Sequence, residues 1–206
     1  MPYQTPLTGR AVGVPETLEH LRKKMEGVAT DFAAGKMNRA QFNAIYAHYN
    51  EQRILVEKLH KRNPDNDLWR QAALPGHTGF LRTHFESRMM FYIVFRHRDP
   101  RPLIKGGEEP AKETGRQIGT IIKTVWQMDK LPTTGLARKA MGDGKWIVMA
   151  IGELALTVAI YSLQPSQQQH TLVRDLHNDF ERANRLILQR NLSANKMVFP
   201  QRALLT

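Results

Sequence analysis

Residues 144–163, GKWIVMAIGELALTVAIYSL, form the longest apolar run of the chain and decide its predicted fold. Gly152-Glu153, near the middle, has the composition of a two-residue type II′ turn, which takes glycine at its first central position. The two halves are then strands of a β-hairpin whose alternate residues point to opposite faces. Both faces are apolar, which is typical of central strands covered by helices on both sides. The predicted register pairs Ile151 with Leu154, Met149 with Leu156, and Ile147 with Val158.

A membrane-spanning helix is the alternative for residues 144–163, because about 18 largely apolar residues can just cross a bilayer. Glu153 would then lie near the bilayer centre, where a carboxylate costs roughly 2.5–3.5 kcal/mol on insertion scales. That cost favours the hairpin, as do the many β-branched residues of the run. We therefore expect no association with a membrane.

Elements on both sides of this hairpin complete a sheet and its covering helices. Residues 89–95 (MMFYIVF) and 103–105 have the composition of strands, and residues 136–141 that of an edge strand. Long helices are expected at residues 108–129 and 167–190. Their apolar residues recur at helical spacing: Ile118, Ile121, Ile122, Val125 and Met128 in the first, and Leu172, Leu176, Phe180, Ala183 and Ile187 in the second. The predicted fold class is α/β (α+β), with an antiparallel five-stranded sheet sandwiched by helices.

An N-terminal α-helical hairpin is expected ahead of this domain. Each of its two helices has apolar residues at helical spacing along one face. A short loop at Gly35 makes the two helices antiparallel neighbours. Two helices of this size bury little surface, so we expect the hairpin to dock on the main domain or to dimerise. The predicted organisation is a disordered arm at 1–14, the hairpin at 15–63, a linker at 64–84, the α/β domain at 85–190 and a loosely held tail at 191–206.

The order of elements from Met89 onward resembles that of roadblock/LC7 domains, which are related to longin and profilin-like domains. It runs strand, strand, long helix, three strands, long helix, with the turn Gly142-Asp143-Gly144 ahead of the central hairpin. The helical hairpin resembles the SHOCT type through its loop, Gly35-Lys36-Met37-Asn38-Arg39-Ala40-Gln41-Phe42. The resemblances imply a non-enzymatic homodimer: the helical hairpin would serve oligomerisation or attachment, and the α/β domain would be a platform for a small GTPase or another signalling partner. A PAS- or GAF-like small-ligand sensor is the alternative on the same element order, and it requires an internal cavity.

The chain carries a large excess of positive charge. Its 30 Lys and Arg residues against 19 Asp and Glu give a net charge of +11. Such an excess attracts acidic partners, which include nucleic acid, an anionic membrane surface and an acidic protein. The alternative is a basic surface that only keeps the protein soluble. The chain has no cysteine, which excludes disulfides, thiolate metal sites and cysteine nucleophiles. Together with an N-terminus that lacks an apolar secretory leader, this leads us to expect a cytoplasmic protein.

Two groups of basic residues are candidates for binding an acidic partner. The first follows the strand at 89–95 and consists of Arg96, Arg98, Arg101 and Lys105, with His97 among them. The second lies on the helical hairpin and consists of Arg22, Lys23, Lys24, Lys58, Lys61 and Arg62, with His60. An antiparallel hairpin brings the start of one helix near the end of the other, so the second group is expected to merge into one patch. For both groups a structural role is the alternative, because loop charges discourage edge aggregation and cations suit the C-terminal end of a helix.

We expect neither a metal site nor a cofactor. His77 and His84 are seven residues apart, as are His170 and His177, and neither pair has the i, i+4 spacing or an obvious carboxylate that would complete a metal site. The chain has no Gly-x-Ser-x-Gly motif, no Walker-type loop and no dinucleotide-binding fingerprint. The segment from His177 to Glu181 is interpreted as a polar stretch of helix, not as a proton relay. We therefore expect a protein that is not an enzyme, with a nucleic-acid-associated protein as the alternative.

Overall fold

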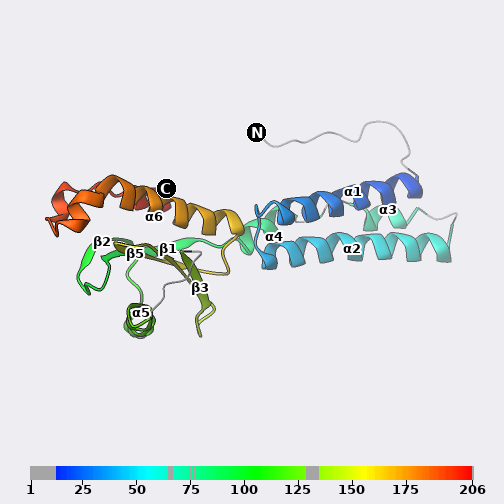
Figure 1. Ribbon diagram of the computed structural model, residues 1–206. Coiled ribbons are helices and arrows are strands. Elements are labelled where there is room, and N and C mark those ends of the chain that lie inside the picture. The colour runs from blue at the N-terminus through cyan, green and yellow to red at the C-terminus, as the bar shows by residue number, and fades with distance from the viewer. Residues whose placement is uncertain (1–12, 65–66, 75, 77, 129–134, 206) are drawn as a thin grey trace. The chain divides into compact units, whose positions relative to one another are not determined.

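The computed structural model describes residues 13–64, 67–74, 76, 78–128 and 135–205. These residues form two compact units, one α-helical and one α/β (Figure 1). The predicted arm at residues 1–14 lies outside the described residues, except for Gly13 and Val14. The predicted fold class is confirmed: a helical pair precedes a five-stranded antiparallel sheet that carries helices.

The helical unit is built on two long antiparallel helices, α1 (Val14–Ala33) and α2 (Arg39–Arg62), which lie side by side in Figure 1. The backbone N–H of Gly13 donates to the Glu16 carboxylate (N to Oε2, 3.1 Å), which satisfies a donor at the start of α1. Leu21 of α1 and Val56 of α2 belong to one buried apolar cluster. This burial of one face of each helix stabilises the pair more than helix propensity does.

Two short helices occupy part of the segment expected to be a linker, residues 64–84. α3 (Trp69–Ala72) contributes Trp69, which is buried in the same cluster as Leu21 and Val56. α4 (Thr78–His84) is held to α2 by Gln41, whose side-chain amide donates to the carbonyl oxygen of Arg82 at 2.7 Å. The described part of residues 64–84 therefore belongs to the helical unit, although its prolines and glycines are typical of a loop.

The α/β unit contains one antiparallel sheet in the strand order β2-β1-β5-β4-β3. Its strands are β1 (Met89–Arg96), β2 (Pro102–Gly107), β3 (Leu136–Ala140), β4 (Trp146–Ile151) and β5 (Ala155–Tyr161). Strand β1 lies beside β5, with Val94 opposite Thr157. The central apolar run is thus a β-hairpin, and its alternative as a membrane-spanning helix is wrong. Among the described residues, no helix is long and apolar enough to cross a bilayer.

One helix covers each face of this sheet (Figure 1). α5 (Lys112–Trp126) packs Ile118, Ile122 and Val125 against the face that carries the larger aliphatic residues of β4 and β5. α6 (Gln167–Gln189) packs Val173, Phe180 and Leu188 against the other face. Every residue of β5 is buried, as expected for a central strand with helices on both sides.

The register of the β4–β5 hairpin differs from the predicted one by two residues. Ile151 lies opposite Leu156, Met149 opposite Val158, and Ile147 opposite Ile160. Gly152 does not have the positive φ that a type II′ turn requires, and the connection is longer than two residues. A shift of two residues keeps every side chain on its predicted face, because the strand period is two.

The buried face of α6 matches the predicted one in part, because Leu176 and Ile187 pack, partly buried, against the same cluster as Phe180. Of the predicted stripe, Phe180 is fully buried, whereas Leu172 is exposed and Ala183 faces solvent. The buried face instead includes three polar residues at seven-residue spacing, His170, His177 and Asn184. A prediction from hydropathy alone places leucines, and not these polar residues, on the buried face of a helix. Polar groups are nevertheless buried where they have hydrogen-bond partners.

The segment expected to be a loosely held tail is part of the core of the α/β unit. It contains the 3₁₀-helices η1 (Ala194–Lys196) and η2 (Pro200–Leu205), and Met197 and Leu204 are buried against the sheet. Asn184 of α6 fixes it by two hydrogen bonds to Val198, from Nδ2 to the carbonyl oxygen (2.7 Å) and from the backbone N–H to Oδ1 (2.9 Å). The prediction was wrong because the segment has no regular apolar period.

Residues 35–38, between α1 and α2, belong to the α/β unit. The backbone N–H of Gln168 donates to the Gly35 carbonyl oxygen at 3.2 Å. The Asn38 side-chain amide donates to the carbonyl oxygen of Phe85 at 2.8 Å, and Met37 is buried. Gly35 has a φ of 73° and an added Cβ would lie 2.7 Å from the Cβ of Gln167, so both its conformation and its surroundings require glycine.

Candidate functional site

Most of the predicted cations in and beside the β1–β2 loop have partners within the protein. Arg96 donates from Nη2 to the carbonyl oxygen of Leu192, just beyond α6 (3.0 Å). Arg101 forms a two-pronged ion pair with Asp99 (Nε to Oδ1, 3.1 Å; Nη2 to Oδ2, 3.0 Å), and these hydrogen bonds lower the pKa of the Asp99 carboxyl. Lys105 pairs with Glu109. An acidic ligand would have to compete with these partners. The pairing therefore favours the alternative for this loop, in which its charges discourage edge aggregation and bind no ligand.

The predicted cations of α1 are also engaged locally. Arg22 Nε lies 3.1 Å from the Glu26 carboxylate, and Lys23 Nζ lies 3.9 Å from that of Glu19. Lys24 Nζ lies 5.4 Å from the centre of the Tyr49 ring of α2, a cation–π contact. The acids interspersed along α1 therefore reduce the positive charge that this helix presents.

The predicted cations of α2 lie in its last two turns. Lys58, Lys61 and Arg62 are exposed, and none of the three has an acidic partner among the described residues. The helix dipole stabilises cations near the C-terminal end of a helix, which explains the position of these residues without any ligand. That they form one patch with the α1 cations stays a prediction.

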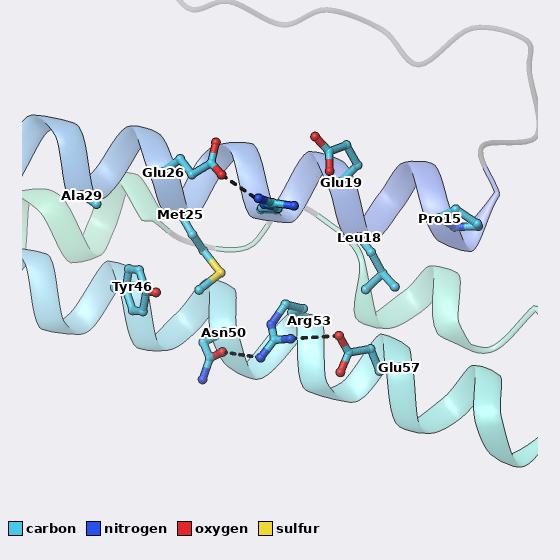
Figure 2. Close-up of a pocket in the computed structure, with 11 residues that line it drawn as sticks. Pro15, Leu18, Glu19, Met25, Glu26, Ala29, Tyr46, Asn50, Arg53 and Glu57 are labelled. Carbon is cyan, nitrogen blue, oxygen red and sulfur yellow. Dashed lines mark hydrogen bonds and ion pairs between the residues drawn. The ribbon is translucent and has the colours of Figure 1, made fainter.

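A groove between α1 and α2, shown in Figure 2, is a candidate binding site that the sequence did not reveal. Its volume is ≈ 630 Å³. Leu18 and Met25 point into the space between the two helices (Figure 2). Ala29 and Tyr46 also line it, and Tyr46 is 37% exposed. The groove therefore combines an apolar floor with access from solvent.

The rim of this groove carries charges of both signs. Its charged residues are Glu19, Arg22 and Glu26 on α1, and Arg53 and Glu57 on α2. Each arginine forms an ion pair with the glutamate four residues later. Arg53 Nη1 lies 2.9 Å from the Glu57 carboxylate, and Arg22 Nε lies 3.1 Å from that of Glu26. Arg53 also donates to the Asn50 side-chain oxygen at 3.0 Å (Figure 2). Opposite charges at i, i+4 are visible in the sequence, but a search for cations alone identified only Arg22.

A buried polar centre joins α6 to the β4–β5 turn. Thr157 Oγ1 and His177 Nδ1 are 2.9 Å apart, and both side chains are buried. One carboxylate oxygen of Glu181 accepts from the backbone N–H groups of Leu154 (2.8 Å) and Ala155 (2.7 Å). The distance from His177 Nε2 to that oxygen is 3.7 Å, which is too long for a hydrogen bond.

Burial lowers the pKa of His177 to about 4, so its imidazole is neutral near pH 7. His177 and Glu181 are then not an ion pair under these conditions. Glu181 instead holds the backbone of the β4–β5 turn through its bonds to Leu154 and Ala155. The interpretation of this segment as a polar stretch of helix did not identify the role of Glu181, because a helix pattern cannot show which turn a carboxylate will reach.

The Glu181→Ala variant is expected to unfold more easily, with a free energy of unfolding lower by about 2–3 kcal/mol, because two backbone donors lose a charged acceptor. The measurement is urea unfolding of the wild type and the variant. Glu153→Ala is the matched control: Glu153 is an exposed glutamate of the same turn, paired with Arg185 at 3.3 Å, and its loss should change stability by less than about 0.5 kcal/mol. Equal effects of the two substitutions would show that Glu181 does not hold the turn.

Possible metal ligands do not converge in the described part of the chain. Within the ranges that the structure describes, no three His, Cys, Asp or Glu side chains are placed to hold a metal ion. His170 and His177 share the buried face of α6, and burial lowers the pKa of both. His77 falls outside the described residues.

Comparisons with protein-family models, with curated proteins and with solved structures find no significant match to this chain. The resemblance to roadblock/LC7 domains and to SHOCT hairpins therefore stays a prediction from element order and loop residues.

Proposed function

We propose that the chain is a non-catalytic scaffold protein, which dimerises and presents its α/β unit as a platform for a protein partner of the small-GTPase class. The observation that carries the proposal is the sheet itself. It is antiparallel, has five strands, and is covered by α5 on one face and α6 on the other (Figure 1). Its elements follow the order whose resemblance to roadblock/LC7 domains suggested such a platform.

The buried polar groups of the α/β unit give further support. The Thr157–His177 pair and the Asn184–Val198 bonds join helix, sheet and C-terminal segment to one another. Buried polar groups that have hydrogen-bond partners favour one packing arrangement of a core. We infer that these groups serve the stability of the interior, and that a protein partner would bind to the outer surface of the unit.

The test combines mass and binding measurements on the full chain. Light scattering between 0.1 and 0.5 M salt is expected to give twice the mass of one chain throughout, although the Debye length falls over this range from about 10 Å to roughly 4.5 Å. An immobilised Ras-type GTPase, loaded with GDP or with a non-hydrolysable GTP analogue, is expected to bind the dimer in one nucleotide state more tightly than in the other. A monomer at every concentration, or no binding to either form, would contradict the proposal.

Nucleic-acid binding is the second candidate, and the observation that favours it is the exposed group Lys58, Lys61 and Arg62 on a chain of net charge +11. Each phosphate that a protein neutralises adds about −0.9 to the slope of log affinity against log salt. A chain that binds duplex DNA through this group should therefore lose about 2–3 units of that slope when all three residues become alanine.

Fluorescence anisotropy with a labelled duplex measures that slope. The matched control replaces Lys112, Arg116 and Lys123 by alanine, which removes the same charge from exposed positions of α5. An equal loss of affinity in both variants would indicate attraction to net charge alone, and no binding by the wild type would exclude this candidate.

A further inference from the structure

We propose that the groove between α1 and α2 binds a second copy of itself, so that two helical units pair face to face about a two-fold axis. The proposal deepens the proposed function, since it names the surface through which the scaffold dimerises. It rests on the composition of the groove, on the sign and order of its rim charges, and on the level at which the two helices face each other.

The local charge of the groove differs from that of the chain. The whole chain has a net charge of +11, whereas the rim has three glutamates and two arginines. Two copies of so basic a chain repel one another unless they meet through a surface that is locally balanced. The groove is such a surface, and its glutamates make it a poor site for a phosphate or an acidic peptide.

The floor provides apolar surface that a second copy would remove from water. Leu18 and Met25 are only half-buried, while Ala29 is exposed and Tyr46 keeps 37% of its surface accessible. Methionine and tyrosine are enriched in the cores of protein interfaces. Two such floors that face each other make a four-helix arrangement, which is the common way for a helical hairpin to bury a second apolar face.

The order of the rim charges fits a two-fold axis. The ring of Phe32 stacks on that of Phe42, and Lys24 lies over the ring of Tyr49. In this antiparallel pair, Glu19 and Arg22 on α1 therefore lie at about the level of Arg53 and Glu57 on α2. A two-fold axis perpendicular to the helices at this level, between the two copies, makes each helix antiparallel to its own counterpart. Arg22 then lies opposite Glu19 of the partner copy, and Arg53 lies opposite Glu57 of the partner copy. A self-complementary surface of this kind is what an isologous dimer requires.

The test is a charge swap on the full chain, measured by sedimentation equilibrium. Arg22→Glu places two glutamates in contact at both symmetric positions, so the dissociation constant is expected to rise about tenfold or more. The double variant Glu19→Arg with Arg22→Glu exchanges the two signs and should reverse most of that rise, since the pairs across the axis form again; only the Arg22–Glu26 pair within each copy stays lost. Arg116→Glu is the matched control, because Arg116 is an exposed arginine on α5 that also pairs with a nearby glutamate (Glu113, 3.5 Å).

The outcomes separate this inference from the proposed function. Weakening by Arg22→Glu, rescue by the swap and no effect of Arg116→Glu would support the groove as the dimer interface. A wild-type dimer that none of the variants changes would overturn the groove while leaving the dimeric scaffold in place. A monomeric wild type would overturn both. A dimer that Arg22→Glu weakens without rescue by the swap would overturn the two-fold pairing, and circular dichroism of each variant shows whether its helices are intact.

Discussion

Replacement of Phe180 by alanine is expected to lower the free energy of unfolding of the α/β unit by about 3–5 kcal/mol, the range for large-to-small changes of buried aromatic residues. Phe180 is fully buried between α6 and the sheet. Its ring stacks on that of Phe199 at a centroid distance of 5.4 Å. The neighbouring segment is tied to α6 through Asn184 and Val198, so it cannot readily move in to fill the cavity.

Urea unfolding followed by tryptophan fluorescence measures this loss. A Trp69→Phe background makes the signal specific, because the two remaining tryptophans, Trp126 and Trp146, both belong to the α/β unit. Leu186→Ala is the matched control on the same helix: Leu186 is 66% exposed, and its truncation should change stability by less than about 0.5 kcal/mol. A small effect of Phe180→Ala would mean that α6 is not packed through this residue.

Acid is expected to destabilise the α/β unit through His177 by up to about 3 kcal/mol, at about 1.4 kcal/mol for each unit of pKa difference. Its pKa is lowered from 6.5 to about 4 by burial. Above pH 6.5 the imidazole is neutral in both states, and stability is unaffected. As the pH falls from 6.5 towards 4, the unfolded chain binds a proton that the folded chain does not, so stability is lost across this window.

The free energy of unfolding measured at several values between pH 7.5 and pH 4.5 tests this dependence. His177→Gln cannot titrate in this range and keeps an amide that can bond to Thr157, so its stability should fall less steeply than that of the wild type. His60→Gln, at an exposed imidazole of α2, is expected to leave the slope unchanged. The other buried histidine of α6, His170, remains in every variant and cancels from the comparison. Parallel slopes for the wild type and His177→Gln would contradict the prediction.

The sheet could be predicted because its signal is local. Residues such as Ile147 and Val158 alternate with smaller apolar residues, and two apolar faces predicted two covering helices, both of which are present. Edge strand β3 was also expected from its short length and its cations, Arg138 and Lys139. These features depend on periodicity within one segment, which a sequence displays directly.

The errors come from contacts between segments far apart in the chain. The β4–β5 turn is held by Glu181, which lies 27 residues after Leu154. The buried face of α6 includes His177, whose partner Thr157 lies 20 residues earlier in the chain. The C-terminal segment is ordered by Asn184, a residue that a hydropathy pattern places on the solvent side. In each case a polar side chain bonds to a partner in a distant segment, and periodicity cannot show that partner.

The candidate site was predicted only in part for a related reason. Basic residues were sought as a group, and the structure shows many of them engaged: Arg101 with Asp99, Arg22 with Glu26. The groove depends on the mixture of both signs with the apolar residues between them. Arg53 and Glu57 became informative only when the antiparallel packing of α1 and α2 placed them beside Glu19 and Arg22.

The loop at residues 35–38 makes the α/β unit a discontinuous domain, because four residues of the N-terminal half are integral to a body formed mainly by residues 85–206. The boundary that the sequence suggests, near residue 85, is therefore a poor place to divide the chain. A fragment that begins at Phe85 would lack the carbonyl acceptor of Gln168 and the amide that reaches Phe85. It would also uncover the surface that Met37 buries. Of the helical unit, the segment at residues 39–84 is thus an insertion within the α/β unit, whereas the segment that carries α1 precedes it.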